Sequence, residues 1–194
     1  MAGEIRGAAF RRLLRTGSPV RVEELAADLG RSAEEIARQV DELNRRGRIC
    51  LDDDGKVAGS AGLSVRPDRH RIEIGGRTFW TWCAFDVVGI FGALRATGRA
   101  HSTSPASGAA IEVHFKAGDP LPSSVVLFRP NDGYLSCCDN VYAQWCPNSN
   151  FFEDEGAARI WSDKRGMSGR VLTLDEASEL GSRDWQPLAR GLSI

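Results

Sequence analysis

The sequence lacks the long apolar run that a membrane-spanning helix requires. None of its hydrophobic stretches reaches the roughly 18 residues needed to cross a bilayer, and residues 1–15 have no secretory cleavage pattern. The formal net charge is only -1, so the chain has no general attraction for nucleic acid or for an anionic membrane. We therefore expect a cytoplasmic protein without a membrane or nucleic-acid partner.

Cysteine and histidine are scarce and spaced in a way that excludes several kinds of site. The chain has five cysteines and three histidines. An odd number of cysteines argues against a disulfide framework. The absence of a CxxC pair argues against a thioredoxin-type site and against the usual zinc-ribbon spacing. With so few histidines, a site for a soft metal would depend on sulfur. The cysteines are Cys50, Cys83, Cys137, Cys138 and Cys146.

Residues 1–60 are predicted to form a first, winged-helix-like domain of three helices and a hairpin. Apolar residues at helical spacing and helix-ending glycines place the helices at 5–14, 22–29 and 32–46. Residues 48–57 form the hairpin. The third helix would be the DNA-recognition helix of such a module. It carries acidic as well as basic side chains, however, and three aspartates follow it in the hairpin turn. A groove-facing surface should be net basic, so we expect a structural or lid role.

Residues 61–194 are predicted to form a second domain that mixes strands with short helices. Two glycines at 75–76 predict a hairpin turn. The expected strands lie at 71–74, 77–80, 98–102, 110–116, 123–128 and 170–173. Short helices are expected at 87–94, 155–164 and 175–180, the last ended by Gly181, and a turn at 131–133. Because strands and helices do not alternate regularly, we predict an α+β fold with a mixed, mainly antiparallel sheet.

Cys83 and Asp86 lie three positions apart at the start of the helix-like run 87–94. Positions i and i+3 share one face of a helix, so the thiol and the carboxylate should point into the same space. The positive end of the helix dipole should lower the pKa of the Cys83 thiol. The alternative is a buried structural cysteine beside an aspartate that stabilises the helix start.

A second thiol lies in an aromatic segment that runs from residue 145 to residue 152. Pro147 should restrict Cys146 to extended backbone geometry. The neighbouring aromatic residues describe either an apolar pocket around the thiol or core packing beside a buried cysteine. The adjacent Cys137 and Cys138 would point to opposite faces of a strand, so at most one of them would share that pocket, and we expect both to be structural.

Taken together, the segments 82–86 and 145–152 resemble the alkylmercury (organomercurial) lyase family, and the order of elements along the chain is similar as well. The resemblance implies protonolysis of a carbon–mercury bond, which yields a hydrocarbon and Hg(II). It places the catalytic, mercury-binding groups on Cys83, Asp86 and Cys146, with Asp86 as the proton carrier. It also implies that no resident cofactor is needed. The expected substrate pocket consists of Trp82, Trp145, Phe151 and Phe152.

The chemistry of mercury agrees with these assignments, because thiolates are the preferred ligands of soft metals. Two sulfurs that share one metal at about 2.3 Å each should lie within roughly 4–5 Å of one another. The implied partners are an organomercury substrate, low-molecular-weight thiols that remove the product, and a mercuric reductase that receives it. Two alternatives stay open: a non-catalytic soft-metal-binding protein or metal-responsive regulator, and a family relative that acts on a different substrate.

Overall fold

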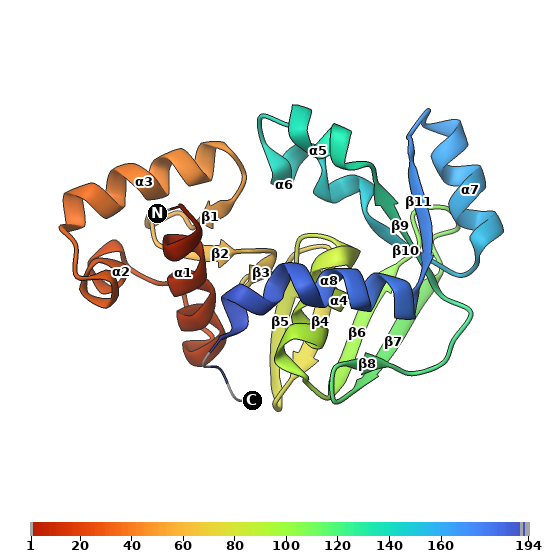
Figure 1. Ribbon diagram of the computed structural model, residues 1–194, viewed down its shortest axis with the longest axis horizontal. Helices are drawn as coiled ribbons and strands as arrows, with labels where there is room; N and C mark the ends of the chain where they lie inside the picture. The colour runs from red at the N-terminus through yellow and green to blue at the C-terminus, as the bar shows by residue number, and fades with distance from the viewer. Residues whose placement is uncertain (1, 191, 193–194) are drawn as a thin grey trace.

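The structure is a computed structural model that describes residues 2–190 and 192. Residues 1, 191, 193 and 194, which lie at the outer ends of the two predicted domains, are outside the described residues. The fold is α+β, as expected: helices come first, followed by antiparallel sheets with short helices (Figure 1). Among the described helices, none is long and apolar enough to cross a membrane.

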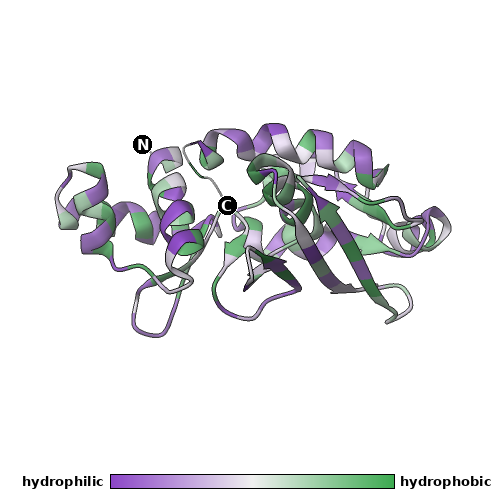
Figure 2. Cartoon of the chain, turned by 90° about the horizontal axis from the view of Figure 1, so that it is seen from below, coloured by the Kyte–Doolittle hydropathy of each residue, from purple (hydrophilic) through white to green (hydrophobic). Residues whose placement is uncertain are grey.

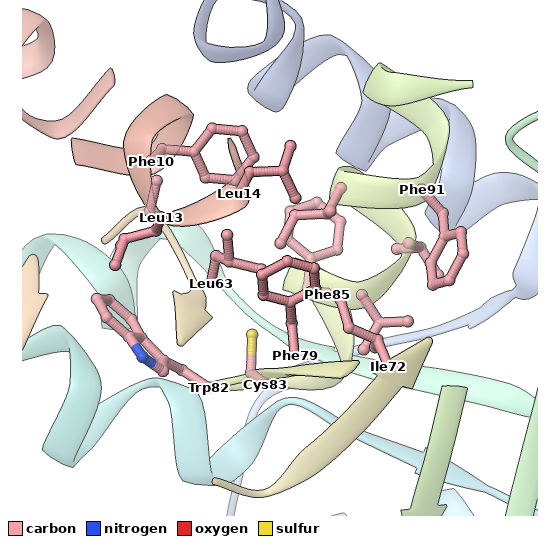
Figure 3. Packing of buried hydrophobic residues seen from close by; sticks show 14 of the residues in the cluster. Phe10, Leu13, Leu14, Leu63, Ile72, Phe79, Trp82, Cys83, Phe85 and Phe91 are labelled. Atoms are coloured by element: carbon pink, nitrogen blue, oxygen red, sulfur yellow. The ribbon is translucent and has the colours of Figure 1, made fainter. Parts of the chain in front are cut away.

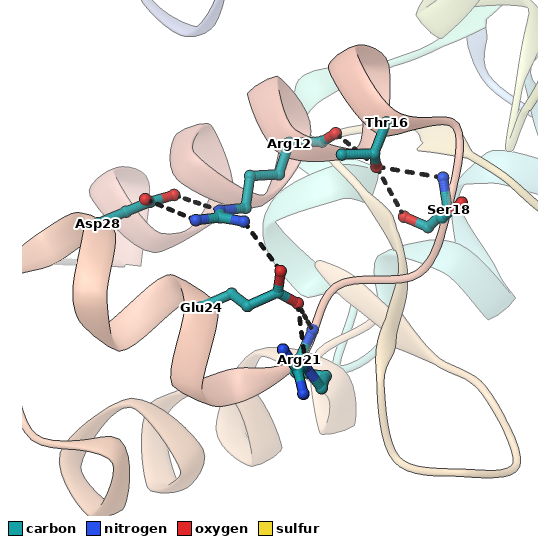
Figure 4. Close-up of polar contacts among 6 residues, drawn as sticks. All are labelled: Arg12, Thr16, Ser18, Arg21, Glu24 and Asp28. Carbon is teal, nitrogen blue, oxygen red and sulfur yellow. Dashed lines mark hydrogen bonds and ion pairs between the residues drawn. The ribbon is translucent and has the colours of Figure 1, made fainter.

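Three helices and two strands form the N-terminal part of the chain. They are α1 (Ala2–Thr16), α2 (Val22–Leu29), α3 (Ala33–Arg45), β1 (Ile49–Leu51) and β2 (Val57–Ser60). Ser32 caps the start of α3, because the backbone N–H of Glu35 donates to its side chain at 3.2 Å. Arg12 of α1 holds α2 through hydrogen bonds to Asp28 (2.8 Å) and Glu24 (3.0 Å) (Figure 4).

One eight-stranded antiparallel sheet runs from the N-terminal hairpin into the rest of the chain, in the order β1-β2-β3-β5-β4-β6-β7-β8. The further strands are β3 (Leu63–Ser64), β4 (His70–Ile74), β5 (Arg77–Thr81), β6 (Gly98–Thr103), β7 (Ala110–Lys116) and β8 (Asp119–Pro120). Buried and exposed residues alternate along β7 and hydrophobic and hydrophilic residues with them (Figure 2), so one face of this strand meets the core and the other meets solvent. The expected domain boundary at 60/61 falls between β2 and β3, which pair with each other; the division stays a prediction.

A smaller three-stranded sheet, in the order β10-β9-β11, lies at the other end of the molecule (Figure 1). Its strands are β9 (Val126–Pro130), β10 (Asn150–Phe152) and β11 (Gly169–Thr173). The helices of this half are α4 (Ala84–Leu94), α5 (Asp132–Cys137), α6 (Val141–Gln144), the 3₁₀ helix η1 (Cys146–Asn148), α7 (Glu155–Lys164) and α8 (Leu174–Ala189). Residues 131–133 were expected to be a turn, and that was wrong, because Asp132 and Gly133 begin α5.

The predicted end of the last helix at Gly181 was also wrong, because α8 continues to Ala189. Gly181 does not end the helix but lets it approach α4 closely. A Cβ atom at Gly181 would lie 2.9 Å from the backbone of Gly89, and a Cβ atom at Gly89 would lie 2.5 Å from the ring of Trp185. The glycines therefore allow α8 to pack against α4, and this contact brings Trp185 to the site described below.

Candidate functional site

Cys83 lies at the junction where β5 ends and α4 begins. It is the N-cap of α4, with extended backbone angles (φ -149°, ψ 169°). Its backbone N–H donates to Oδ2 of Asp86 at 2.8 Å, which is the helix-start contact expected of an acidic residue three positions after the cap. This hydrogen bond holds the carboxylate of Asp86 beside the thiol of Cys83. Figure 3 shows the Cys83 side chain among Trp82, Leu63 and Phe85 of the core.

Cys146 reaches the same place from a segment 63 positions further along the sequence. The backbone N–H of Ala84, the first residue of α4, donates to the carbonyl of Ser149 at 3.0 Å. This bond fastens the segment after Cys146 to the start of α4. The expected extended geometry of Cys146 was wrong, because the residue begins the 3₁₀ helix η1. Pro147 fits there because the missing N–H of a proline costs nothing in the first turn of a helix.

The two sulfurs and a carboxylate oxygen of Asp86 all lie within 4.8 Å of one another. All three residues are buried: their exposed fractions are 0% for Cys83, 6% for Asp86 and 2% for Cys146. The separation matches what two thiolate ligands of one soft metal ion require. The arrangement can therefore bind such an ion between two sulfurs and keep a proton carrier at its side.

Burial controls the protonation of this cluster. It raises the pKa of the Asp86 carboxyl to about 6, although hydrogen bonds from Cys83 and the charge of Arg6 act in the opposite direction. The pKa of the Cys83 thiol is also raised well above its ordinary value, first by burial and then by Cys146 and Asp86. The lowered pKa expected from the helix dipole was therefore wrong, because desolvation of the thiolate outweighs the dipole. The Cys83 thiol therefore keeps its proton at neutral pH unless a metal ion binds to the sulfur in its place.

A cavity of about 270 Å³ opens onto this cluster. Asp86 and Cys146 line it, whereas Cys83 is not among the lining residues and lies behind them. Trp82 and Trp145 contribute apolar walls, as does Phe85, whose ring meets Trp145 edge-on at 6.3 Å. A ligand that enters the cavity thus meets the Cys146 thiol before the Cys83 thiol.

Comparison with known proteins assigns the chain. The family model described as alkylmercury lyase matches residues 63–186. The chain belongs to the alkylmercury lyase family. A curated alkylmercury lyase of Staphylococcus epidermidis is 33% identical over 176 residues, which span 88% of this chain and 76% of that protein. One from Bacillus cereus is 30% identical over 190 residues, covering 92% of this chain and 81% of that protein.

The fold comparison agrees with the family assignment. The chain superposes on the crystal structure of the mercury-bound form of MerB2 with a TM-score of 0.81, covering 94% of this chain and 90% of that one. At 24% identity this likeness shows the shared fold alone. The expected family and enzyme class are confirmed by the sequence relationships, and the expected fold class is confirmed by the structure.

In this member of the alkylmercury lyase family, Phe151 and Phe152 lie away from the cavity. Both are buried in β10. The ring of Phe151 meets that of His70 edge-on, with 5.9 Å between the ring centroids. The ring of Phe152 packs on that of Trp161, with 5.3 Å between the centroids. They were expected in the pocket lining, but neither lines the cavity: Phe151 belongs to the main core and Phe152 to the smaller cluster around Trp161, because successive residues of a strand point to opposite faces.

The remaining cysteines are separate from the buried cluster. Burial raises the pKa of the Cys50 thiol in β1 to about 12. Cys137 and Cys138 were expected on a strand, and that was wrong: Cys137 ends α5 and Cys138 is its C-cap. Cys137 is exposed, whereas Cys138 donates its S–H to the carbonyl of Tyr134 at 3.1 Å. All five thiols are free.

Several residues that line the cavity were not predicted from the sequence. They come from parts of the chain that only the tertiary fold brings together, and they include Arg6, Arg48, Arg129, Leu135, Val141, Trp185 and Leu188. Trp185 of α8 donates its indole N–H to the carbonyl of Ala61 at 2.8 Å and meets Phe85 edge-on at 5.8 Å. No local pattern distinguished these residues from ordinary core or surface residues.

Proposed function

We propose that this lyase cleaves carbon–mercury bonds by protonolysis and that Cys83, Asp86 and Cys146 carry the reaction. The observation that carries the proposal is the convergence of two sulfurs and one carboxylate within 4.8 Å in a buried cluster. Membership in the alkylmercury lyase family supplies the substrate class, an organomercury compound. The soft metal fits the sulfur ligands, and the adjoining carboxylate fits a proton carrier.

Cys146 is proposed to bind the substrate first, because it lines the cavity and Cys83 does not. The substrate R–Hg–SR′ arrives as an adduct of a small thiol. A sulfur–mercury bond forms at Cys146 and the bond from mercury to SR′ breaks. The proton of Cys146 leaves on the thiol R′SH. The hydrocarbon group then remains on mercury, next to Cys83 and Asp86.

Asp86 is proposed to move the proton that breaks the carbon–mercury bond. As the Cys83 sulfur binds mercury, its proton passes to the carboxylate of Asp86. Asp86 then donates that proton to the carbon, the carbon–mercury bond breaks, and the hydrocarbon R–H leaves Hg(II) held by two thiolates. A carboxyl with a pKa of about 6 suits both steps, because a group that titrates near the working pH can accept and return a proton.

Turnover assays with a phenylmercury compound and excess small thiol test this assignment. Benzene and thiol-bound Hg(II) should be released by the intact protein. Cys83→Ser, Asp86→Asn and Cys146→Ser should each lower the rate at least about 100-fold, as is typical when a proton carrier or nucleophile is lost. Cys137→Ser is the control, because that thiol is exposed and outside the cluster. Full activity in Asp86→Asn would contradict the proton-transfer role.

We also infer a cytoplasmic setting with low-molecular-weight thiols and a mercuric reductase as partners and no nucleic-acid contact. Five free thiols support a reducing compartment.

Residues 1–60 are proposed to act as a lid, which is supported by the positions of Arg6 and Arg48 in the cavity wall. The transfer of Hg(II) to the two partners can be tested on protein loaded with Hg(II). Each partner is added in turn, and a chromophoric mercury chelator reports how much Hg(II) leaves the protein. Complete retention of the metal by the protein would contradict it.

A further inference from the structure

Two arginines of the cavity wall, Arg6 and Arg48, make no direct ion pair among the described residues. Arg6 comes from α1 and Arg48 from the residue before β1. Within the described part of the chain, neither guanidinium makes an ion pair with an acidic side chain, although most surface arginines of the protein do so. The Nε atom of Arg6 is buried and has no hydrogen-bond partner. A buried donor that lacks a partner costs free energy, so this one is available to a ligand.

The two arginines also repel each other. The pKa of Arg6 is lowered, first by burial and then by the positive charge of Arg48, while the charge of Asp86 acts in the opposite direction. Folding has therefore placed two like charges at one cavity although their interaction is unfavourable. A negatively charged ligand between them would replace that repulsion by attraction in a partly dehydrated place, where electrostatic interactions are strong.

The other charges of the cavity offset the positive charges of Arg6 and Arg48 only in part. Arg129 is balanced by Asp132, with Nη2 2.6 Å from Oδ1, and Asp184 lines the cavity near it. Asp86 is the acid whose charge acts on Arg6, and one carboxylate offsets only one of the two positive charges of Arg6 and Arg48.

We propose that Arg6 and Arg48 bind the carboxylate of a negatively charged small thiol, which delivers the organomercury group and later removes Hg(II). Guanidinium groups match carboxylates with two parallel hydrogen bonds. Cys146 opens onto the same cavity, so a thiol anchored there by its carboxylate shares that cavity with the mercury-binding thiol. The inference rests on the proposed function and adds the identity of the thiol that the site prefers.

The same anchor serves both ends of the reaction. On entry, the carboxylate of R–Hg–SR′ is held while mercury moves to Cys146 and R′SH is released. On exit, two molecules of R′SH exchange with the Hg(II) that bridges Cys83 and Cys146. They form Hg(SR′)₂ and return one proton to each cysteine. Each step exchanges one sulfur–mercury bond for another, so no oxidant or reductant is needed.

Three small thiols of similar size test the proposal: mercaptoacetate (anionic), 2-mercaptoethanol (neutral) and cysteamine (cationic). Each is supplied as its phenylmercury adduct with a matched excess of free thiol, and KM and kcat for benzene release are measured. For the intact protein, KM should be roughly tenfold lower with mercaptoacetate than with 2-mercaptoethanol, the size of one charge-assisted hydrogen-bonded contact, and highest with cysteamine. This preference should weaken as salt is added.

The variants separate the arginines from general effects of charge. Arg48→Gln should abolish the preference, so that KM with mercaptoacetate is no longer lower than KM with 2-mercaptoethanol. Arg48→Lys should keep part of the preference. Arg6→Gln removes the other positive charge and should also abolish the preference, so it tests the proposal if Arg48→Gln folds poorly. Arg38→Gln is the matched control, since Arg38 is exposed on α3 and does not line the cavity; it should keep the full preference.

The outcomes distinguish this inference from the function on which it rests. Benzene release with equal KM for all three thiols would overturn the carboxylate site and leave the lyase function intact. No benzene with any thiol would contradict the function itself. The last arm uses 4-carboxyphenylmercury with 2-mercaptoethanol. If Arg48→Gln raises KM only in that arm, the arginines recognise the hydrocarbon group, and the proposal for the thiol is wrong.

Discussion

Gly62 has no side chain at the point where the carboxyl group of Asp86 lies. A Cβ atom at Gly62 would be 2.2 Å from the carboxyl carbon of Asp86, which is far inside van der Waals contact. The residue also has a positive φ of 83°, and its carbonyl accepts a hydrogen bond from the backbone of Trp82 at 3.0 Å. The turn between β2 and β3 thus fixes the position of the proposed proton carrier.

Replacing Gly62 by alanine should therefore disable the site. Gly62→Ala is expected to displace the Asp86 carboxyl and to lower kcat by at least about 100-fold, the range typical for loss of a positioned acid or base. Gly55→Ala is the matched control, because Gly55 has a similar φ of 74° but open space around it. Both variants should lose about 1 kcal/mol of stability to backbone strain. Equal activity in the two variants would refute the steric argument.

Asp86 should reduce the stability of the protein at neutral pH. Its folded-state pKa of about 6 lies above its usual 3.8, so between these values the folded state binds more protons than the unfolded state. Stability should then fall as the pH rises from about 4 to 6. Asp86→Asn removes the cost of ionising a buried carboxyl, so this variant should be more stable than the intact protein at pH 7 by on the order of 3 kcal/mol. Urea unfolding at pH 4 and pH 7 measures the difference; the same pH dependence in both proteins would contradict it.

The local part of the site could be predicted from the sequence. The i, i+3 relation placed the Cys83 thiol and the Asp86 carboxyl together, because the start of a helix has a fixed geometry. The two-glycine hairpin before it was predicted for the same reason: Gly75 and Gly76 both adopt positive φ, at 58° and 74°. Cys146 entered through the resemblance to a family, since nothing within its own segment indicates which distant thiol it meets.

Properties that depend on tertiary packing could not be predicted. The pKa of Cys83 was expected to be lowered because the helix dipole is visible in the sequence, whereas the complete burial that raises it is not. Gly181 has the pattern of a helix end, and only the presence of α4 explains why the helix continues through it. Arg6 and Arg48 belong to the wall of the cavity because of how the N-terminal helices pack, and no local pattern shows this.

His70 should make the protein unstable in mild acid. It is buried, its Nδ1 lies 2.7 Å from Oγ of Ser102, and burial lowers its pKa from 6.5 to about 3. Below pH 6.5 the unfolded state takes up a proton that the folded state cannot accept until about pH 3, so stability falls as the pH drops through that window. The loss should reach roughly 2 kcal/mol at pH 5. His70→Gln should flatten this part of the pH profile, measured by urea unfolding; an unchanged slope would show that other groups cause it.

Gly89 should be essential for the packing of α8 against α4. A Cβ atom there would lie 2.5 Å from the ring of Trp185, and that ring forms part of the cavity wall. Gly89→Ala is expected to cost about 1–3 kcal/mol, as overpacking of a core does, and to raise KM because Trp185 must move. Gly3→Ala is the control: Gly3 lies in α1 with nothing within 4 Å, so alanine there should stabilise the helix by up to about 1 kcal/mol. Thermal unfolding together with the turnover assay measures both effects. If Gly89→Ala were as stable as Gly3→Ala, the close contact between the two helices would not be what holds α8 in place.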